Sequence, residues 1–374
     1  MVGTASYPRA VFAERLDRAR AAMVERGVDV ALFSLGADLP YFTGYEAMPL
    51  ERLTMLVLPN DGDATLVVPR LEAPRVLVRP EAFAVRAWDE TEDPVAIVAG
   101  LAGSPRVAAI GDRTWARFLV DLQVELPSTS WLRASEVTSP LRSVKDTAEV
   151  ESLRRASAAA DRVAVALQAG DVALVGRTEA EVSAELGQRL VAEGHHRVNF
   201  AIVAAGANAA SPHHEPGPRV IEAGEVVLCD FGGTMPDGYC SDITRCVHTG
   251  PVPNELAELY AVLAEAQVAA VAAAVVGTTC EEVDAVARLR IAEAGWGEHF
   301  IHRTGHGIGL EEHEEPYLVA GNTDPLVAGH AFSVEPGIYL AGRTGARIED
   351  IVVATDAGPD PLNRVDHDLV VVEA

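Results

Sequence analysis

Residues 301–316 read IHRTGHGIGLEEHEEP and bring three histidines, His302, His306 and His313, into one glycine-rich segment. The interleaved glycines let the backbone approach its neighbours closely. Imidazole is a common metal ligand and carries protons near neutral pH. His306 and His313 lie seven positions apart, which is not the spacing of a helical HExxH site. The segment therefore predicts a strand or loop that lines a functional site.

Acidic residues end two apolar strands, one on each side of this segment. VVLCD ends at Asp230 and AFSVE ends at Glu335, and a second predicted strand then carries Asp242 in the first case and Glu349 in the second. An acid that ends a buried strand needs a partner, because an unpaired buried charge is costly. The pattern predicts two acidic hairpins.

The second part of the chain repeats itself weakly with an offset of 101 residues. Thr178 and Thr279 each begin a predicted helix as the first residue of a capping box, and Gly206 and Gly307 keep the same offset. Each half then reads as helix, helix, strand and acidic hairpin. Two such halves, facing each other about a pseudo-twofold axis, would bring both hairpins to one centre.

Such a centre would gather four carboxylates and one imidazole. The carboxylates would repel one another without cations and could not all stay ionised. Oxygen donors with a single imidazole suit manganese, cobalt, iron or zinc. Two such ions, roughly 3.5–4 Å apart, can share a hydroxide and lower its pKa, which is the chemistry of amide hydrolysis. The competing interpretation is that these acids are ordinary turn or surface residues. The predicted donors are Asp230, Asp242, His306, Glu335 and Glu349.

The length of 374 residues favours two domains. Alternating helices and strands predict a small α/β domain over residues 1–141. A second domain over residues 142–374 begins with a helix that Asp146 and Glu149 would cap. The elements expected in the first domain are a helix over 9–26, strands over 29–34, 54–59, 64–69 and 106–110, and a helix over 115–126.

The chain is strongly acidic, with 55 acidic against 30 basic residues and a formal charge of −25. This charge disfavours nucleic acid and anionic membranes as partners. The N-terminal stretch lacks the apolar core of a signal peptide, and the apolar run 268–277 is too short to span a bilayer. The four cysteines form no CxxC pair, which predicts buried, reduced thiols. These features together predict a cytoplasmic protein.

The blocks DFGG, SDITR, HRTGHGIGLEEHE, SVEPGIY and RIEDIVV together resemble the signature of the pita-bread metallopeptidases, and within them the Xaa-Pro aminopeptidases and Xaa-Pro dipeptidases, or prolidases. The resemblance implies an α+β fold, in which a pita-bread domain with pseudo-twofold halves follows a smaller creatinase-like α/β domain. It implies hydrolysis of the bond between an N-terminal residue and proline in short peptides, through a hydroxide that bridges two divalent ions, most often manganese. It also implies a homodimer or homotetramer.

The resemblance assigns a role to each predicted metal ligand. Asp230 would hold one ion, and His306 and Glu335 would hold the other. Asp242 and Glu349 would bridge both ions. Glu335 also matches an acid to which a proton-transfer role is often assigned.

The same resemblance assigns residues around the ligands. His213 matches a histidine near the scissile bond, and His302 and His313 match two further histidines of the substrate cleft. Arg347 lies two residues before Glu349 and would orient an acidic ligand from the same strand face. Tyr339 fits either cleft lining or packing. Six further histidines are expected at the surface, namely His195, His196, His248, His299, His330 and His367.

One departure from the family pattern bears on peptide length. Prolidases restricted to dipeptides commonly carry an arginine four residues after the histidine that matches His313, and this chain has Tyr317 there. That arginine would hold the free carboxylate of a dipeptide, so its absence counts against a strict Xaa-Pro dipeptidase and for an Xaa-Pro aminopeptidase. The short interval between Glu335 and Glu349 instead resembles the prolidase-like members, so the peptide length stays open. Two more remote alternatives are a creatinase-like amidinohydrolase without the metal pair and a catalytically inactive peptide-binding module.

Overall fold

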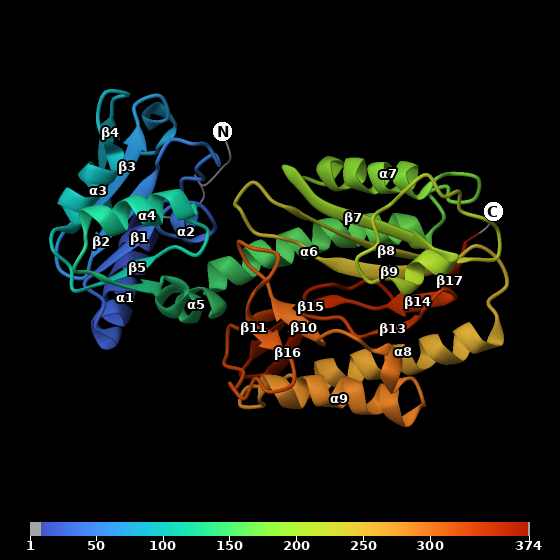
Figure 1. Cartoon of the computed structure of the whole chain (residues 1–374). Helices are drawn as coiled ribbons and strands as arrows, with labels where there is room; N and C mark the ends of the chain where they lie inside the picture. The colour runs from blue at the N-terminus through green and yellow to red at the C-terminus, as the bar shows by residue number, and fades with distance from the viewer. Residues whose placement is uncertain (1–8, 373–374) are drawn as a thin grey trace. The chain divides into compact units, whose positions relative to one another are not determined.

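The computed structural model describes residues 9–372. These residues divide into two compact units, 9–142 and 143–372. Each unit has its own sheets and its own hydrophobic core (Figure 1).

The first unit is built on a six-stranded sheet in the order β4-β3-β2-β1-β5-β6. β1 pairs antiparallel with β2 and parallel with β5, so the sheet is mixed. The hairpin expected over 54–69 is confirmed as β2 and β3. Val98, Phe118 and Leu122 of α3 and α4 pack against the sheet. The elements are α1 (Arg9–Arg26), β1 (Val30–Phe33), α2 (Asp38–Thr43), β2 (Met55–Pro59), β3 (Ala64–Pro69), η2 (Ala73–Arg75), β4 (Phe83–Trp88), α3 (Pro94–Ala102), β5 (Val107–Ile110), α4 (Ala116–Glu125), β6 (Ser130–Arg133) and α5 (Ser135–Ser143).

Each half of the second unit begins with two helices and continues with strands, and the predicted α+β architecture is confirmed. The first half contains α6 (Thr147–Gln168), α7 (Glu179–Ala192), β7 (Arg197–Ala205), η3 (Gly206–Ala210), β8 (Val226–Thr234) and β9 (Ile243–His248). The second half contains α8 (Asn254–Ala273), α9 (Cys280–Glu293), η4 (Gly297–His299), β10 (Gly305–Gly307), β11 (Glu314–Leu318), β12 (Ala331–Val334), β13 (Gly337–Leu340), β14 (Thr344–Arg347), β15 (Asp350–Thr355), β16 (Gly358–Pro361) and β17 (Val370–Val371).

Three helices of this unit begin where the sequence predicts. Asp146, Thr178 and Thr279 are the N-caps of α6, α7 and α9, and each side chain accepts a hydrogen bond from the backbone N–H three residues later. The glutamate at that third position bonds back to the N-cap backbone, which completes a capping box. Each box satisfies two N–H groups that a helix start leaves without an intrahelical partner.

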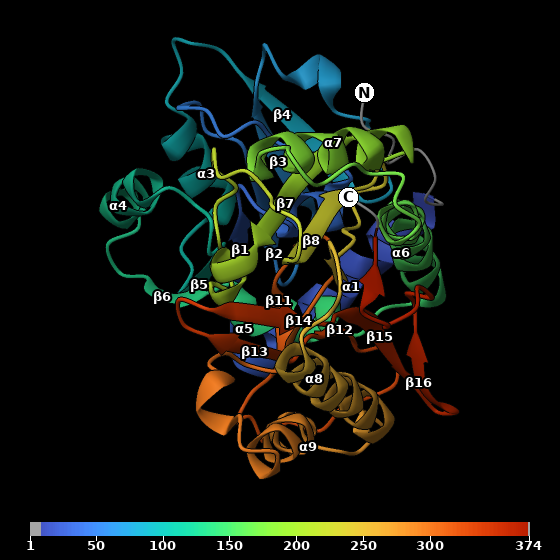
Figure 2. The ribbon, with the colours of Figure 1, turned by 90° about the vertical axis from the view of Figure 1, so that its right-hand side faces the viewer.

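The strands of the second unit lie between two helical layers. Figures 1 and 2 show α6 and α7 on one side of the strands and α8 and α9 on the other. Leu167 and Leu186 pack with Phe231 in the core beneath α6 and α7. Leu263 and Phe332 belong to the core beneath α8 and α9. Each such side chain contributes roughly 1.5–3 kcal/mol when it is fully buried, so both layers hold the strands rigidly.

α8 is the one helix among the described residues that is long and apolar enough to cross a membrane by length and composition. Its residues Leu256, Leu259 and Leu263 recur at helical spacing and are buried in the core. The apolar character of α8 is therefore that of a helix that packs on a sheet.

The two acidic strand pairs differ in one respect. β8 and β9 form the hairpin expected around Asp230 and Asp242. The chain between Glu335 and Glu349 instead folds into a separate two-stranded ladder, β13 with β14. β12 pairs antiparallel with β15 around this insertion. The extra ladder was not predicted from the sequence. Glu335 directly follows β12, and Glu349 directly precedes β15.

Candidate active site

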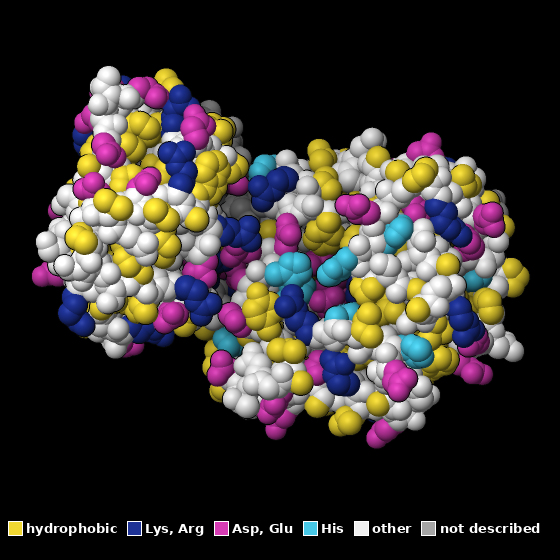
Figure 3. All heavy atoms as spheres, viewed as in Figure 1, with side chains coloured by type: hydrophobic (Ala, Val, Ile, Leu, Met, Phe, Trp, Pro, Cys, Tyr) yellow, Lys and Arg dark blue, Asp and Glu magenta, His cyan; other side chains and the backbone are white. Residues whose placement is uncertain are grey.

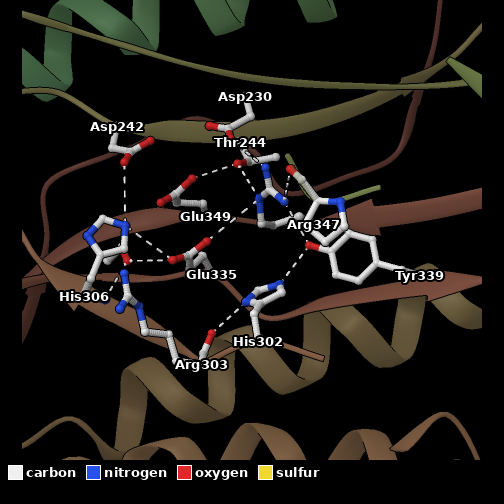
Figure 4. A network of polar contacts seen from close by, with 12 residues as sticks. Asp230, Asp242, Thr244, His302, Arg303, His306, Glu335, Tyr339, Arg347 and Glu349 are labelled. Carbon is white, nitrogen blue, oxygen red and sulfur yellow. Dashed lines mark hydrogen bonds and ion pairs between the residues drawn. The ribbon is translucent and has the colours of Figure 1, made fainter. Parts of the chain in front are cut away.

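The five predicted metal ligands converge in the second unit. One ligand atom from each of Asp242, His306 and Glu349 lies within 4.8 Å of the other two, and all three residues are buried. His306 Nε2 is 3.3 Å from Glu335 Oε1. Figure 4 shows these four side chains and Asp230 pointing toward one another from different strands.

Both halves of the unit supply ligands, and direct contacts join the halves. The backbone N–H of Cys240 donates to the carbonyl of Gly309 at 2.9 Å, next to the histidine segment. Thr244 and Glu349 form an isolated antiparallel bridge. The ligands lie in β8 (Asp230), before β9 (Asp242), in β10 (His306), after β12 (Glu335) and between β14 and β15 (Glu349).

The acids of this cluster raise one another's pKa values. Burial raises the pKa of Asp242, and the charges of Glu349, Asp230 and Glu335 raise it further. The pKa of Glu349 is raised for the same two reasons. Burial also raises the pKa of Glu335 to about 7. Carboxylates in this arrangement cannot all be ionised near neutral pH unless a positive charge joins them.

The donor atoms fit divalent cations. Oδ1 of Asp230 and Oδ1 of Asp242 are buried and have no hydrogen-bond partner among residues 9–372. A buried carboxylate oxygen without a partner is costly, and a bound cation would offset that cost. Carboxylate oxygens with one imidazole form a donor set suited to manganese, cobalt, iron or zinc.

His306 presents one ring nitrogen to the cluster. Its Nδ1 is 3.1 Å from the carbonyl oxygen of Gly307, which can only accept, so Nδ1 carries the proton. Nε2 then has a free lone pair toward Glu335 and Asp242. Burial lowers the pKa of His306, which keeps the imidazole neutral and able to bind a metal.

Arg347 connects three parts of the site through its guanidinium. Nη2 donates to Asp230 Oδ2 at 2.5 Å, Nε donates to Thr244 Oγ1 at 3.1 Å, and Nη1 donates to Tyr339 Oη at 2.9 Å. The Thr244 hydroxyl donates in turn to Glu349 Oε2 at 2.7 Å. Thr244 lies in the SDITR block, but nothing in the sequence singled it out.

The three predicted cleft histidines have different surroundings. Nδ1 of His302 donates to the carbonyl of Arg303 at 2.7 Å, and its Nε2 accepts from Tyr339 Oη at 2.8 Å. Burial lowers the pKa of His302 to about 4. The ring of His313 lies 4.1 Å from that of His306. Within residues 9–372 the imidazoles of His213 and His313 make no hydrogen bond.

Some predictions for the other histidines are wrong. His195 was expected at the surface, but its exposed fraction is 2% and its Nε2 accepts from Ser241 Oγ at 2.8 Å, directly beside Asp242. His248 and His330 are also buried. His214 contacts Glu179 at 2.8 Å, which leaves His213 as the exposed member of the pair.

The start of α6 holds both acidic halves in place. Lys145 Nζ forms a buried ion pair with Glu314, directly after His313. Glu149 accepts from Tyr239 Oη at 2.6 Å, in the turn between β8 and β9. From the sequence, Glu149 was predicted only as part of a helix cap and Lys145 was given no role, because their partners lie far away along the chain.

Histidine and acidic side chains gather on one face of the second unit. Figure 3 shows histidine side chains (cyan) gathered around acidic side chains (magenta) on that face, with lysine or arginine side chains (dark blue) beside them. The four cysteines are free and buried, as predicted, and are not among the clustered donors.

Residues 151–356 match the model of metallopeptidase family M24, and residues 15–144 match the creatinase/prolidase N-terminal domain. The chain is 43% identical to the probable dipeptidase PepE of Mycobacterium tuberculosis, with 99% of each chain covered. It is 37% identical to the Xaa-Pro dipeptidase of Lactobacillus helveticus, with 96% of this chain and 98% of the relative covered. The crystal structure of dipeptidase PepE from Mycobacterium ulcerans matches with a TM-score of 0.93 and 45% identity, covering 98% of this chain and 100% of that one. The predicted resemblance is confirmed, and the chain belongs to metallopeptidase family M24, with the family's creatinase/prolidase N-terminal domain.

Proposed function

We propose that this protein is a dinuclear-metal exopeptidase that hydrolyses the peptide bond between an N-terminal residue and proline. The observation that carries the proposal is the buried convergence of Asp242, His306 and Glu349 beside Asp230 and Glu335. The names of the relatives, a probable dipeptidase and an Xaa-Pro dipeptidase, support this substrate class.

We propose Xaa-Pro dipeptides as the principal substrates. The relatives named above favour dipeptides. One sequence feature counts against a strict dipeptidase, because Tyr317 occupies the position where dipeptide-restricted enzymes commonly have an arginine. An Xaa-Pro aminopeptidase that accepts longer peptides therefore remains the second candidate.

The proposed metal ligands are the five clustered residues. Asp230 would hold one ion, His306 and Glu335 the other, and Asp242 and Glu349 would lie between them. When bound, two divalent ions, with manganese as the first choice, supply Lewis-acid activation of water and of the scissile carbonyl.

The proton movements fall to residues of the chain. Hydrolysis adds the elements of water across the C–N bond, so the attacking water gives up a proton and the proline nitrogen gains one. We assign that proton to Glu335, because it matches the family acid with this role and its Oε1 lies 3.3 Å from His306 Nε2 in the cluster. Ser333 Oγ lies 3.3 Å from Glu335 Oε1 and helps to fix the carboxyl group.

Two of the three histidines, His213 and His313, would act on the substrate, and His302 would position a neighbouring side chain. His213 and His313 have no hydrogen bond from their rings within residues 9–372, so they are available to stabilise the developing oxyanion or to assist the leaving nitrogen. His302 has protein partners on both ring nitrogens. We therefore assign His302 to positioning Tyr339 at the edge of the cluster.

The proposal is tested with enzyme stripped of metal and reloaded with manganese, assayed on Ala-Pro, Ala-Pro-Ala and Ala-Ala. Hydrolysis of Ala-Pro only in the reloaded enzyme is the expected result. Cleavage of Ala-Pro-Ala at a comparable rate would move the assignment to the aminopeptidase. Hydrolysis that persists without metal, or equal cleavage of Ala-Ala, would refute the proposed activity.

A further inference from the structure

Arg303, next to His302, is a cation without an acidic partner. Its guanidinium carbon lies 4.4 Å from the centre of the Tyr317 ring, and the side chain is half-buried. No carboxylate of residues 9–372 lies within ion-pair distance of it. Stacking on an aromatic ring fixes a guanidinium in place. The N–H groups in the plane of the guanidinium stay free to donate hydrogen bonds.

Neighbouring arginines are placed differently. Arg347 is paired with Asp230, and Arg288 is paired with Asp284 at 2.9 Å. Acidic residues outnumber basic ones by 55 to 30 in this chain, so an arginine that avoids them all beside the candidate site stands out. A partly desolvated guanidinium without an anion is unfavourable, and an anionic ligand would offset that cost.

The position of Tyr317 brings this cation to the candidate metal site. Tyr317 in β11 is the direct cross-strand neighbour of the predicted ligand His306 in β10. Cross-strand neighbours project from the same face of a sheet. Figure 4 shows the Arg303 side chain extending toward His306.

We propose that Arg303, held against Tyr317, binds the free carboxylate of the C-terminal proline in a dipeptide substrate. The inference rests on the proposed function and names a specificity residue for it. A dipeptide carries this carboxylate one residue beyond the scissile bond, whereas a longer peptide has a neutral amide there. A guanidinium fork binds a carboxylate through two parallel hydrogen bonds. From the sequence, Tyr317 marked the absence of the arginine that binds the dipeptide carboxylate. In the structure, Tyr317 holds Arg303, which would bind that carboxylate instead.

The experiment compares Ala-Pro with its C-terminal amide, Ala-Pro-NH2, in the manganese-loaded enzyme. Wild type is expected to favour Ala-Pro over the amide by about tenfold to a hundredfold in kcat/KM, the range for a hydrogen-bonded charge pair. Arg303→Gln should reduce kcat/KM for Ala-Pro by a similar factor, chiefly through KM, and remove the preference. Arg303→Lys should keep part of the preference, because it retains the charge without the fork.

Further variants distinguish carboxylate binding by Arg303 from a general loss of activity or stability. Tyr317→Phe keeps the ring and should keep the preference, whereas Tyr317→Ala should weaken it. Arg290→Gln is the matched control, because Arg290 on α9 forms an exposed ion pair with Glu265 on α8. A second measurement is product binding: free proline should inhibit wild type more strongly than prolinamide, and Arg303→Gln should abolish that difference.

The outcomes distinguish this inference from the function on which it rests. If wild type cleaves no Xaa-Pro bond with any metal, the proposed function fails and the inference fails with it. If Ala-Pro is cleaved but Arg303→Gln lowers the rates on the acid and the amide equally, only the carboxylate role is wrong. A selective loss on Asp-Pro, with Ala-Pro unaffected, would show that Arg303 contacts the first side chain instead.

Discussion

Thr244 and Glu349 come from different halves of the second unit and meet through two hydrogen bonds. The hydroxyl of Thr244 donates to Glu349 Oε2 at 2.7 Å, and the backbone N–H of Glu349 donates to the carbonyl of Thr244 at 3.3 Å. The same hydroxyl accepts from Arg347 Nε at 3.1 Å. One small side chain thus orients a proposed bridging carboxylate and the arginine behind it.

Replacing the Thr244 hydroxyl should weaken metal binding. Thr244→Val keeps the shape but removes the donor to Glu349, and loss of such an outer partner typically costs about 10–100-fold in metal affinity or activity. Manganese titration of the stripped protein, followed calorimetrically, measures the change. Thr244→Ser retains the hydroxyl and should restore most of the affinity. A valine variant with wild-type affinity and turnover would contradict this role.

Asp242→Asn should abolish turnover. It should also reduce the increase in melting temperature that manganese causes. Without metal, the variant should melt no lower than wild type, because one of several repelling buried carboxylates is gone. Manganese should raise the melting temperature of wild type and have a much smaller effect on the variant. Asp360→Asn, in an ion pair on β16, is the control. Normal activity in the Asp242 variant would overturn the ligand assignment.

The Lys145–Glu314 ion pair should matter most when only one partner is removed. Both side chains are buried, so Lys145→Met leaves a carboxylate without compensation and should cost about 3–5 kcal/mol in the free energy of unfolding. Lys145→Met combined with Glu314→Leu leaves no lone charge and should recover much of that loss. Denaturant unfolding of the single and double variants measures the coupling. If the losses of the Lys145→Met and Glu314→Leu single variants simply add in the double variant, the pair is not coupled.

His330 should make the protein sensitive to acid. Burial lowers its pKa to about 4, and the charge of Lys145 contributes, while Asp324 opposes the shift. Between about pH 6.5 and pH 4 the unfolded chain binds a proton at this residue and the folded chain does not, so stability is lost as the pH falls.

The expected size of this effect is roughly 2 kcal/mol at pH 5 for His330 alone. His330→Gln should lose correspondingly less stability than wild type between pH 7 and pH 5, measured by denaturant unfolding at each pH. The exposed His196, changed to Gln, is the control. A His330 variant with the same pH dependence as wild type would show that another group is responsible.

Local features of the sequence predicted most of the elements. The capping boxes at Thr178 and Thr279 and the apolar spacing of the helices that follow depend on residues three or four positions apart. The same holds for the hairpin of β2 and β3, whose turn is read from adjacent residues. The ladder of β13 and β14 was missed, because the signature blocks on either side were read as one simple hairpin.

Some residues of the candidate site were also identified from the sequence, and others were not. Five side chains that converge in the structure were singled out from the sequence by residue type, predicted strand ends and the repeat, and their role as metal ligands stays a prediction. His195 was missed because its buried partner, Ser241, is 46 positions away. Tyr339 was left open because its role depends on Arg347 and His302, which reach it from separate segments.

Residue types and short-range spacing were enough to indicate which side chains can bind cations and to predict the capped helices and the β2–β3 and β8–β9 hairpins, although not the β13–β14 ladder. Only the tertiary structure decided which partners orient those side chains, since Arg347, Thr244, Lys145 and Glu149 act across gaps of 90 residues or more. It also decided that Arg303 lies on Tyr317 with no acidic partner among residues 9–372. Burial and charge pairing at such distances depend on how whole layers pack, and no local pattern of residues records that packing.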